Sequence, residues 1–144
     1  MCQSVGSKSR KGFTLVELAV VIVIIGVLAA FGVPRFLVSV ERSKAAESFG
    51  YLSAVRDSQE RYQAQNGTYA SDLTTLDITQ SNPTYFSVGT CTATDTTWTC
   101  TLTRQGATAG YAAYTVTFTQ NGFDATNSTI PAVINPMGSA GTGT

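Results

Sequence analysis

The sequence predicts an α+β protein in which one long N-terminal helix packs against an antiparallel sheet of about four strands. Three observations support this fold class. Residues 13–33 are almost entirely apolar, residues 35–65 repeat apolar side chains at helical spacing, and the segments after residue 83 are rich in threonine, aromatic and β-branched residues. A chain of 144 residues can form one such domain with an anchor, but not two independent cores.

The N-terminal segment has the length of a membrane-spanning helix. The 16 residues from Leu18 to Val33 include no polar side chain. Counted from Phe13, the segment would form a helix of about 31 Å, enough to cross the apolar core of a bilayer. The basic cluster "KSRK" precedes it, so the positive-inside rule places the N-terminus in the cytoplasm and the following residues outside.

Glu17 stands near the start of this apolar segment, although a carboxylate at a bilayer centre costs about 2.5–3.5 kcal/mol on insertion scales. One interpretation is a secretory signal peptide cleaved near Ala29-Ala30, but an A-x-A cleavage pattern is missing. A second is an uncleaved anchor that holds a monomeric domain on the membrane, which gives Glu17 no role. A third interpretation comes from the residues around Glu17.

The segment "KGFTLVE" resembles the cleavage and methylation motif of type IV prepilins. In that family a glycine precedes the cleavage site, a methylated aromatic residue follows it, and a glutamate stands at the fifth position of the mature chain. The apolar helix of the family also carries a glycine and, further on, a proline. These positions are matched in order by Gly12, Phe13, Glu17, Gly26 and Pro34. The resemblance extends over residues 8–65 and is that of a type IVa-like major pilin with a class III leader.

This resemblance implies a structural subunit of a type IV pilus, not an enzyme, and no cofactor. A membrane-embedded prepilin peptidase would cleave between Gly12 and Phe13 and methylate the new amino group of Phe13. Glu17 of one subunit would then pair with the Phe13 amino group of a neighbour as identical subunits polymerise through their N-terminal helices. The inner-membrane pilus assembly machinery would transfer the precursor from the inner membrane to a cell-surface filament that serves adhesion, motility or related functions.

Two alternatives stay open. A pseudopilin of a type II secretion system would share the leader, Glu17 and the long helix. The calcium-binding C-terminal loop typical of the major pseudopilin is not recognisable in the sequence, which favours a pilus. A membrane-anchored monomeric binding domain is the alternative from another class of protein.

The predicted organisation is a leader at 1–12, a transmembrane and filament-core helix at 13–34, its amphipathic continuation at 35–65, a β-sheet domain at 66–137 and a flexible tail at 138–144. Proline removes one hydrogen bond of a helix, and glycine lowers its stability. Gly26, Gly32 and Pro34 therefore mark the stretch that bends or unwinds most easily. Because the apolar spacing resumes after Pro34, we expect one continuous helix.

The second half of this helix is amphipathic. Its predicted buried stripe consists of Ala45, Phe49, Leu52, Val55 and Tyr62. Its predicted charged face carries Glu41, Arg42, Lys44, Glu47, Arg56, Asp57, Glu60 and Arg61. On that face, the spacing of four residues predicts two ion pairs, Arg56 with Glu60 and Asp57 with Arg61. Asn66-Gly67 is the expected stop.

The strands are predicted at "TYFSVGTC", "TWTCTLTR" and "YAAYTVTFTQ", and a hairpin at "TQNGFDAT". In the third segment Tyr114, Val116 and Phe118 are expected to be buried, and the alternating threonines, including Thr117, to face water. The dipeptide Asn121-Gly122 favours a type I′ turn in the hairpin.

The cysteines and charges narrow the functional classes. Cys91 and Cys100 are spaced for a disulfide across a hairpin, and the N-terminal segment sends them to an oxidising compartment. Many type IVa pilins instead carry their disulfide near the chain end. Without histidine the chain has no Ser-His or Cys-His pair, and no metal site is expected. Without residues 1–12 the net charge is −3, so nucleic acid is not an expected partner.

Overall fold

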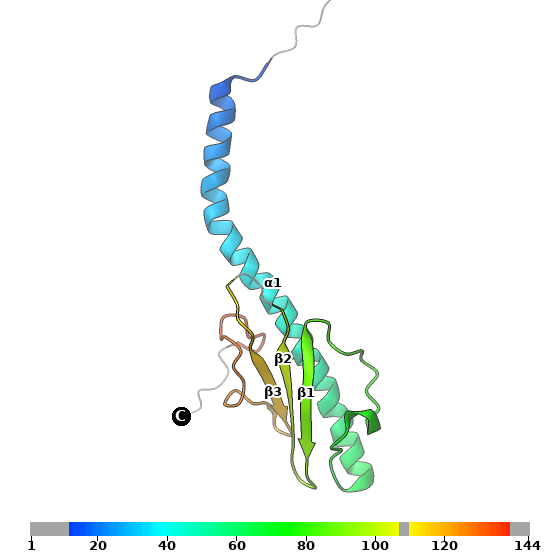
Figure 1. The fold of residues 1–144 in the computed structure, drawn as a ribbon. Coiled ribbons are helices and arrows are strands. Elements are labelled where there is room, and N and C mark those ends of the chain that lie inside the picture. Colours follow the sequence, from blue (N-terminus) through cyan, green and yellow to red (C-terminus); the bar gives the residue numbers. More distant parts are fainter. Residues whose placement is uncertain (1–11, 107–109, 139–144) are drawn as a thin grey trace, which may run out of the picture. The chain divides into compact units, whose positions relative to one another are not determined.

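The computed structural model describes residues 12–106 and 110–138. The chain divides into two compact units, of which the first ends at Arg35 and the second begins at Phe36. One helix, α1 (Leu15–Asn66), has residues in both units and includes Pro34 in its interior (Figure 1). The continuous helix that the sequence predicts is therefore confirmed. The predicted leader at 1–12, apart from Gly12, and the tail residues 139–144 lie outside the described residues.

In the first unit, the apolar part of α1 is not covered by the other residues that the structure describes. None of its most apolar 18-residue window is buried, and that window is long and apolar enough to cross a membrane. Phe13 and Leu15 are 82% and 83% exposed. An exposed apolar surface of this size is typical of a segment that lipid or other protein covers.

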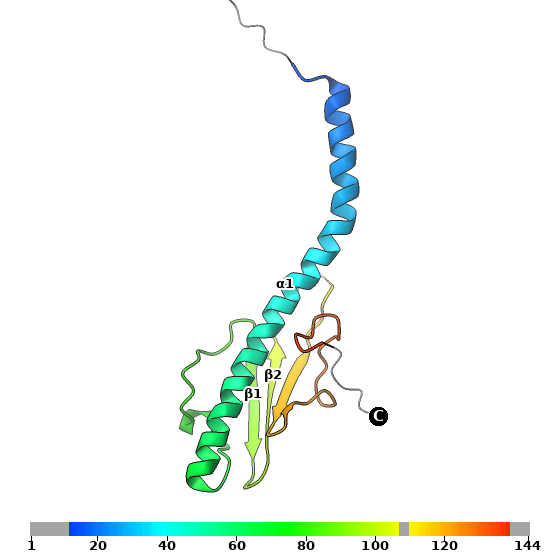
Figure 2. The same cartoon turned by 180° about the vertical axis from the view of Figure 1, so that it is seen from behind.

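The second unit confirms the α+β fold. It contains the remainder of α1 and an antiparallel sheet in which the strands follow in sequence order. The elements after α1 are a short 3₁₀ helix η1 (Leu73–Thr75), β1 (Phe86–Ala93), β2 (Trp98–Arg104), β3 (Thr115–Thr119) and β4 (Gly122–Phe123). Seen from behind, α1 lies across one face of β1 and β2 (Figure 2).

The core of this unit forms between α1 and that face of the sheet. Of the predicted stripe, Ala45, Phe49, Leu52 and Val55 are buried and Tyr62 is half-buried. The sheet contributes side chains from alternate positions of its two middle strands, namely Trp98, Cys100, Leu102, Val116 and Phe118. The period-two burial of β2 thus packs against the helical stripe, as the sequence predicts, whereas in β3 the intervening Thr117 is buried as well.

Glu41 is not on the charged surface where the sequence placed it. It is fully buried, and its Oε1 accepts a hydrogen bond of 2.7 Å from Arg104 Nε and one of 3.1 Å from the Tyr114 hydroxyl. The carboxylate raises the pKa of Arg104, while burial, followed by the charge of Glu41, raises the pKa of Tyr114. The positive charge of Arg104 on β2 offsets the cost of burying the Glu41 carboxylate. Helical spacing could not predict this pair, because the two residues are 63 positions apart in the sequence.

The two ion pairs expected along α1 are absent from the described residues. Arg61 instead binds Asp77 at 2.8 Å, and Ser58 donates a hydrogen bond to the same carboxylate. These contacts with Arg61 and Ser58 lower the pKa of Asp77 to about 2. Arg56 donates to the backbone oxygen of Gln120 at 3.2 Å. Arg61 and Arg56 therefore bind residues that follow α1 in the sequence, and not the helix neighbours that the spacing predicted.

The β3–β4 hairpin also differs from its prediction. Thr119 pairs with Gly122, so Gln120 and Asn121 form the turn, and only Gly122 has a positive φ, of 99°. A type I′ turn needs positive φ at both central residues, so that prediction is wrong. A glycine in the left-handed region directly after the turn instead fits a type I turn followed by a G1 bulge.

Thr117 was expected to face water, but it is only 1% exposed. Its side chain hydrogen-bonds Thr101 Oγ1 at 2.9 Å and donates to the backbone oxygen of Asn127 at 3.1 Å. The segment after β4 therefore covers this position. The hydroxyl remains satisfied under this cover, which is why a polar side chain can occupy a buried site.

Breaking the buried Glu41–Arg104 pair on one side is expected to destabilise the second unit strongly. Glu41→Ala leaves the guanidinium buried without its carboxylate, which costs about 3–5 kcal/mol. Urea unfolding of the full chain in detergent, followed by the fluorescence of Trp98, measures this because Trp98 is the single tryptophan and is buried. The double variant Glu41→Leu/Arg104→Leu should recover much of the loss.

The exposed ion pair of Arg61 and Asp77 supplies the control, since Arg61→Ala should barely change the urea midpoint of unfolding. Equal shifts of the midpoint for Glu41→Ala and Arg61→Ala would contradict the expectation.

Candidate assembly site at the start of the helix

The residues that the sequence singles out for processing and assembly lie at the N-terminal end of α1. Gly12, Phe13 and Thr14 precede the helix, and all three are exposed. A side chain at Gly12 would meet nothing within 4 Å, so packing within the chain does not require glycine there. An exposed, sterically open backbone is accessible to a processing enzyme.

Thr14 and Glu17 form a capping box. The backbone oxygen of Thr14 accepts a hydrogen bond of 3.3 Å from the Leu18 amide, which places Thr14 at the N-cap. Glu17 Oε2 accepts hydrogen bonds from the Thr14 amide at 2.8 Å and the Thr14 hydroxyl at 2.9 Å. The Glu17 amide in turn donates to Thr14 Oγ1 at 3.3 Å. These reciprocal contacts satisfy two amides that a helix N-terminus leaves free.

The capping box gives Glu17 a role that the sequence reasoning missed. The pattern T-x-x-E directly before an apolar run is its signature and is present in the sequence as Thr14 to Glu17. Only Oε2 takes part in these contacts; among the described residues Oε1 has no hydrogen-bond partner. The carboxylate therefore both begins the helix and keeps one oxygen available for a donor from another molecule.

The residues predicted to weaken the helix lie within α1. A side chain at Gly26 or Gly32 would meet nothing within 4 Å among the described residues, so packing against those residues requires neither glycine. Small residues on an apolar helix allow another helix to approach closely. Their small size is therefore of use only to a neighbouring molecule, or to the flexibility of the helix itself.

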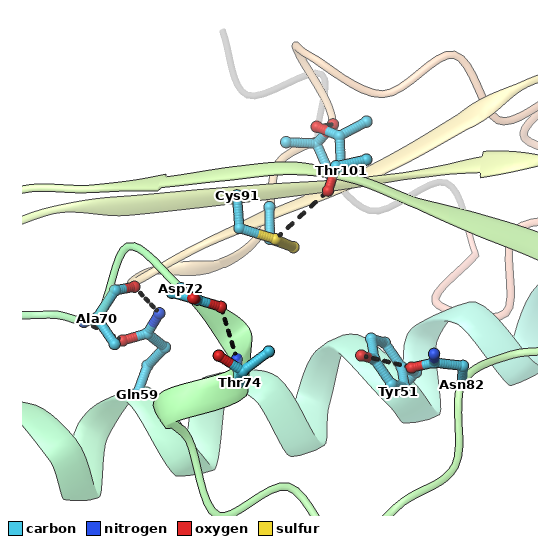
Figure 3. The surroundings of a disulfide bond; sticks show 11 residues. Tyr51, Gln59, Ala70, Asp72, Thr74, Asn82, Cys91 and Thr101 are labelled. Carbon is cyan, nitrogen blue, oxygen red and sulfur yellow. Dashed lines mark hydrogen bonds between the residues drawn. A yellow bond between two sulfur atoms is a disulfide. The ribbon is translucent and has the colours of Figure 1, made fainter.

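The predicted disulfide between Cys91 and Cys100 is present and joins paired residues of β1 and β2. Figure 3 shows the surroundings of the disulfide, which include residues of the α1–β1 connection, the segment 67–85 between α1 and β1. There Gln59 Nε2 donates to the backbone oxygen of Ala70 at 2.7 Å, and the Tyr51 hydroxyl contacts Asn82 at 3.2 Å. Each polar group is occupied in holding the connection in place, so this region is structural.

Comparison with known proteins defines the class. Residues 7–33 match the prokaryotic N-terminal methylation motif, which is the segment that carries Gly12, Phe13 and Glu17. Residues 41–136 match the pilin family of bacterial filaments. The chain therefore belongs to the pilin family, whose members are structural filament subunits and not enzymes. Together the motif and the fold make it a type IV pilin or pseudopilin-like subunit.

Individual relatives come from both branches of this class. The type IV wide pilus major component PilA4 of Thermus thermophilus is 39% identical over 48% of this chain and 53% of its own length. The type IV major fimbrial protein FimA of Dichelobacter nodosus is 55% identical over 33% of this chain and 29% of its own. The type II secretion system core protein G of Pseudomonas aeruginosa is 32% identical over 54% of each chain. The chain thus spans about half the length, or less, of the curated relatives it matches.

Loss of the capping hydroxyl is expected to fray the first turn of α1. Thr14→Val removes the acceptor for the Glu17 amide and costs about 1 kcal/mol of helix stability, whereas Thr14→Ser keeps it. Hydrogen exchange of the amides at residues 16–18 in the detergent-solubilised full chain should be faster in Thr14→Val and unchanged in Thr14→Ser. Identical exchange in all three proteins would show that the capping box does not stabilise the helix.

Proposed function

We propose that this chain is the structural subunit of a type IV pilus, cleaved after Gly12, methylated at Phe13 and polymerised through its N-terminal helix into a cell-surface filament. Two observations together carry the proposal. None of the apolar stretch of α1 is buried by the described residues, and among these residues Glu17 Oε1 has no hydrogen-bond partner. In a filament core of packed helices, neighbouring subunits would cover the apolar surface of α1 and would supply a positively charged amino group to Glu17 Oε1.

Cleavage after Gly12 would create the cation. The backbone nitrogen of Phe13, an amide in the precursor, becomes a charged α-amino group, and N-methylation leaves that charge in place. Glu17 of a neighbouring subunit then has a partner for Oε1. Removing two charges from water is repaid only in good geometry, so this pair would set the axial register between helices.

Transfer from lipid to a helix bundle gains little hydrophobic free energy, because lipid tails are as apolar as the side chains they cover. Close packing and the Phe13–Glu17 pair must therefore supply the specificity of assembly. Gly26 and Gly32 would allow helices to approach closely, and with Pro34 they would let α1 unwind locally in the filament.

The proposed life history follows from these steps. Residues 1–12 act as leader, and 13–34 span the inner membrane until a prepilin peptidase and methyltransferase has acted. The inner-membrane assembly machinery then moves the subunit into the filament, where residues 66–137 face outward and determine what the pilus touches. Adhesion and motility are the expected uses.

A pseudopilin of a type II secretion system is the second candidate, because the chain is 32% identical to a core protein G over 54% of its length. A pseudopilin would share the cleavage, the methylation and the Glu17 pair. It would not supply the main subunit of a long filament outside the cell.

Intact mass and N-terminal sequencing of the sheared surface fraction test the proposed function. The expected subunit begins at methylated Phe13 and has a mass two hydrogens below that of the reduced chain, because Cys91 and Cys100 are joined. The same mature chain found in the cell envelope but not in the sheared fraction would favour the pseudopilin. An uncleaved chain in the membrane would contradict both and favour the anchored monomer.

Replacement of Glu17 is expected to block assembly without blocking export. Glu17→Ala removes the acceptor for the neighbour's amino group, and we expect the yield of sheared filaments to fall by about tenfold or more, since each 1.4 kcal/mol is a factor of ten. Quantitative immunoblots of sheared and membrane fractions measure this. Asp57→Ala, which removes an exposed carboxylate further along α1, is the matched control and should assemble normally. Normal filament yield from Glu17→Ala would exclude the pair as an assembly determinant.

A further inference from the structure

The two edges of the sheet in the second unit differ. On the β3 side, β4 pairs with Phe118 and Thr119, and the segment that follows β4 closes the part of β3 that β4 leaves unpaired. Thr115 and Thr117 donate their amides to the hydroxyls of Thr129 and Ser128 at 2.8 and 2.9 Å, and their carbonyls accept from the amides of Thr129 and Asp124 at 3.1 and 2.9 Å. No backbone group of these two residues is left for another strand.

The opposite edge, along β1, is open. Gln105 donates its amide to the Tyr85 carbonyl, so Tyr85 faces β2. Because antiparallel strands alternate, Phe86 and Val88 direct their backbone groups away from β2. Among the described residues, no hydrogen bond from outside the sheet reaches the backbone of either one. Gly89, Thr90 and Thr92 of the same strand are exposed.

The α1–β1 connection meets the end of this edge, where the Tyr69 amide donates to the Thr94 carbonyl just after β1 at 3.3 Å, but further along the connection is fastened to α1. Ala70 is held by Gln59, Asp77 by Arg61 and Ser58, and Asn82 by Tyr51. Glu47 accepts hydrogen bonds from the amides of Thr84 and Tyr85 at 2.8 and 3.1 Å. A pocket of about 410 Å³, lined by Val88 of β1, Tyr51 of α1 and Leu73, Leu76, Ile78 and Asn82 of the connection, remains beside the strand.

The open edge also lacks the usual protection against pairing. Its sequence, FSVGTCTA, contains no lysine, no other charge and no proline. The β1–β2 register shifts between Val88 and Cys91, and such a bulge bends the strand and shortens any stretch that can pair. A second strand could therefore bind here without charge repulsion, but over a short length.

We propose that β1 pairs antiparallel with β1 of a second copy of this chain, and that this contact joins subunits of two filaments. This inference rests on the proposed function. The part of β3 that β4 leaves unpaired is closed, so among the described strands β1 is the edge that one copy can offer to the sheet of another, and two identical uncharged edges meet without repulsion. Such a contact is isologous and has a two-fold axis, whereas subunits along one helical filament are related head to tail.

A single contact of this kind is weak, because few backbone hydrogen bonds form on either side of the bulge. Two filaments aligned side by side repeat it many times, and multivalency raises the overall affinity by about 10²–10⁴ without any new type of contact. Isolated chains in detergent should therefore stay monomeric, while filaments associate laterally into bundles. Backbone pairing is not driven by charge, so bundles should persist at about 0.5 M salt.

A lysine on the open edge tests the proposal. Filaments sheared from wild-type cells and from Thr92→Lys cells are compared by low-speed sedimentation and electron microscopy. We expect the bundled fraction to fall by about tenfold in Thr92→Lys, with unchanged filament yield. Thr126→Lys is the matched control, since it adds the same charge at an exposed position beyond β4 and should bundle like the wild type.

Hydrogen exchange gives a second readout. Amides of residues 86–93 should exchange more slowly in wild-type bundles than in dispersed Thr92→Lys filaments, while those of residues 124–129 should not differ. Bundling that is equal in wild type and Thr92→Lys, equally lost in Thr126→Lys, or absent from wild-type filaments would overturn the β1 contact and leave the pilus subunit intact. Absence of filaments from wild-type cells would overturn the proposed function as well as the contact.

Discussion

The apolar surface of α1 must be covered at every stage in the life of the chain, and the other features serve this constraint. Residues 15–33 receive no cover from the described remainder of the chain. Lipid can provide it before assembly, and the helices of neighbouring subunits can provide it afterwards. Because these two environments are similarly apolar, the exchange between them has little driving force of its own. Direction and register must then come from the few polar groups placed along the helix.

Two of the polar groups on α1, the carboxylates of Glu41 and Glu17, have different roles. Glu41 is buried with the guanidinium of Arg104 from β2 and the phenol of Tyr114, which precedes β3, so its partners belong to the same chain and join the sheet to α1 within the second unit. Among the described residues Glu17 contacts Thr14 alone, which occupies one carboxylate oxygen. A carboxylate that is satisfied internally stabilises a fold, whereas one that is half satisfied in an apolar setting favours whichever assembly completes it.

The sequence predicts what depends on local pattern. Apolar spacing identified α1 and its buried stripe, and the nine-residue separation of Cys91 and Cys100 indicated the disulfide. It failed where the partner is distant in sequence: Glu41 needs Arg104, Arg61 needs Asp77, and Thr117 is covered by the segment after β4. The capping box at Thr14 is different, because its signature is local and was available beforehand. For the candidate site, the sequence singled out Gly12, Phe13 and Glu17 but not the cap at Thr14, while the geometry showed which oxygen of Glu17 has no partner among the described residues.

The claim that Glu17 gains a second partner on assembly is tested most directly by an electron cryomicroscopy map of the filament that resolves side chains at residues 13–17. We expect Phe13 N of one subunit to lie within about 4 Å of Glu17 of a neighbour, the distance of an ion pair. A map in which Glu17 contacts only Thr14 of its own chain, with the Phe13 amino group bound elsewhere, would contradict this account of assembly.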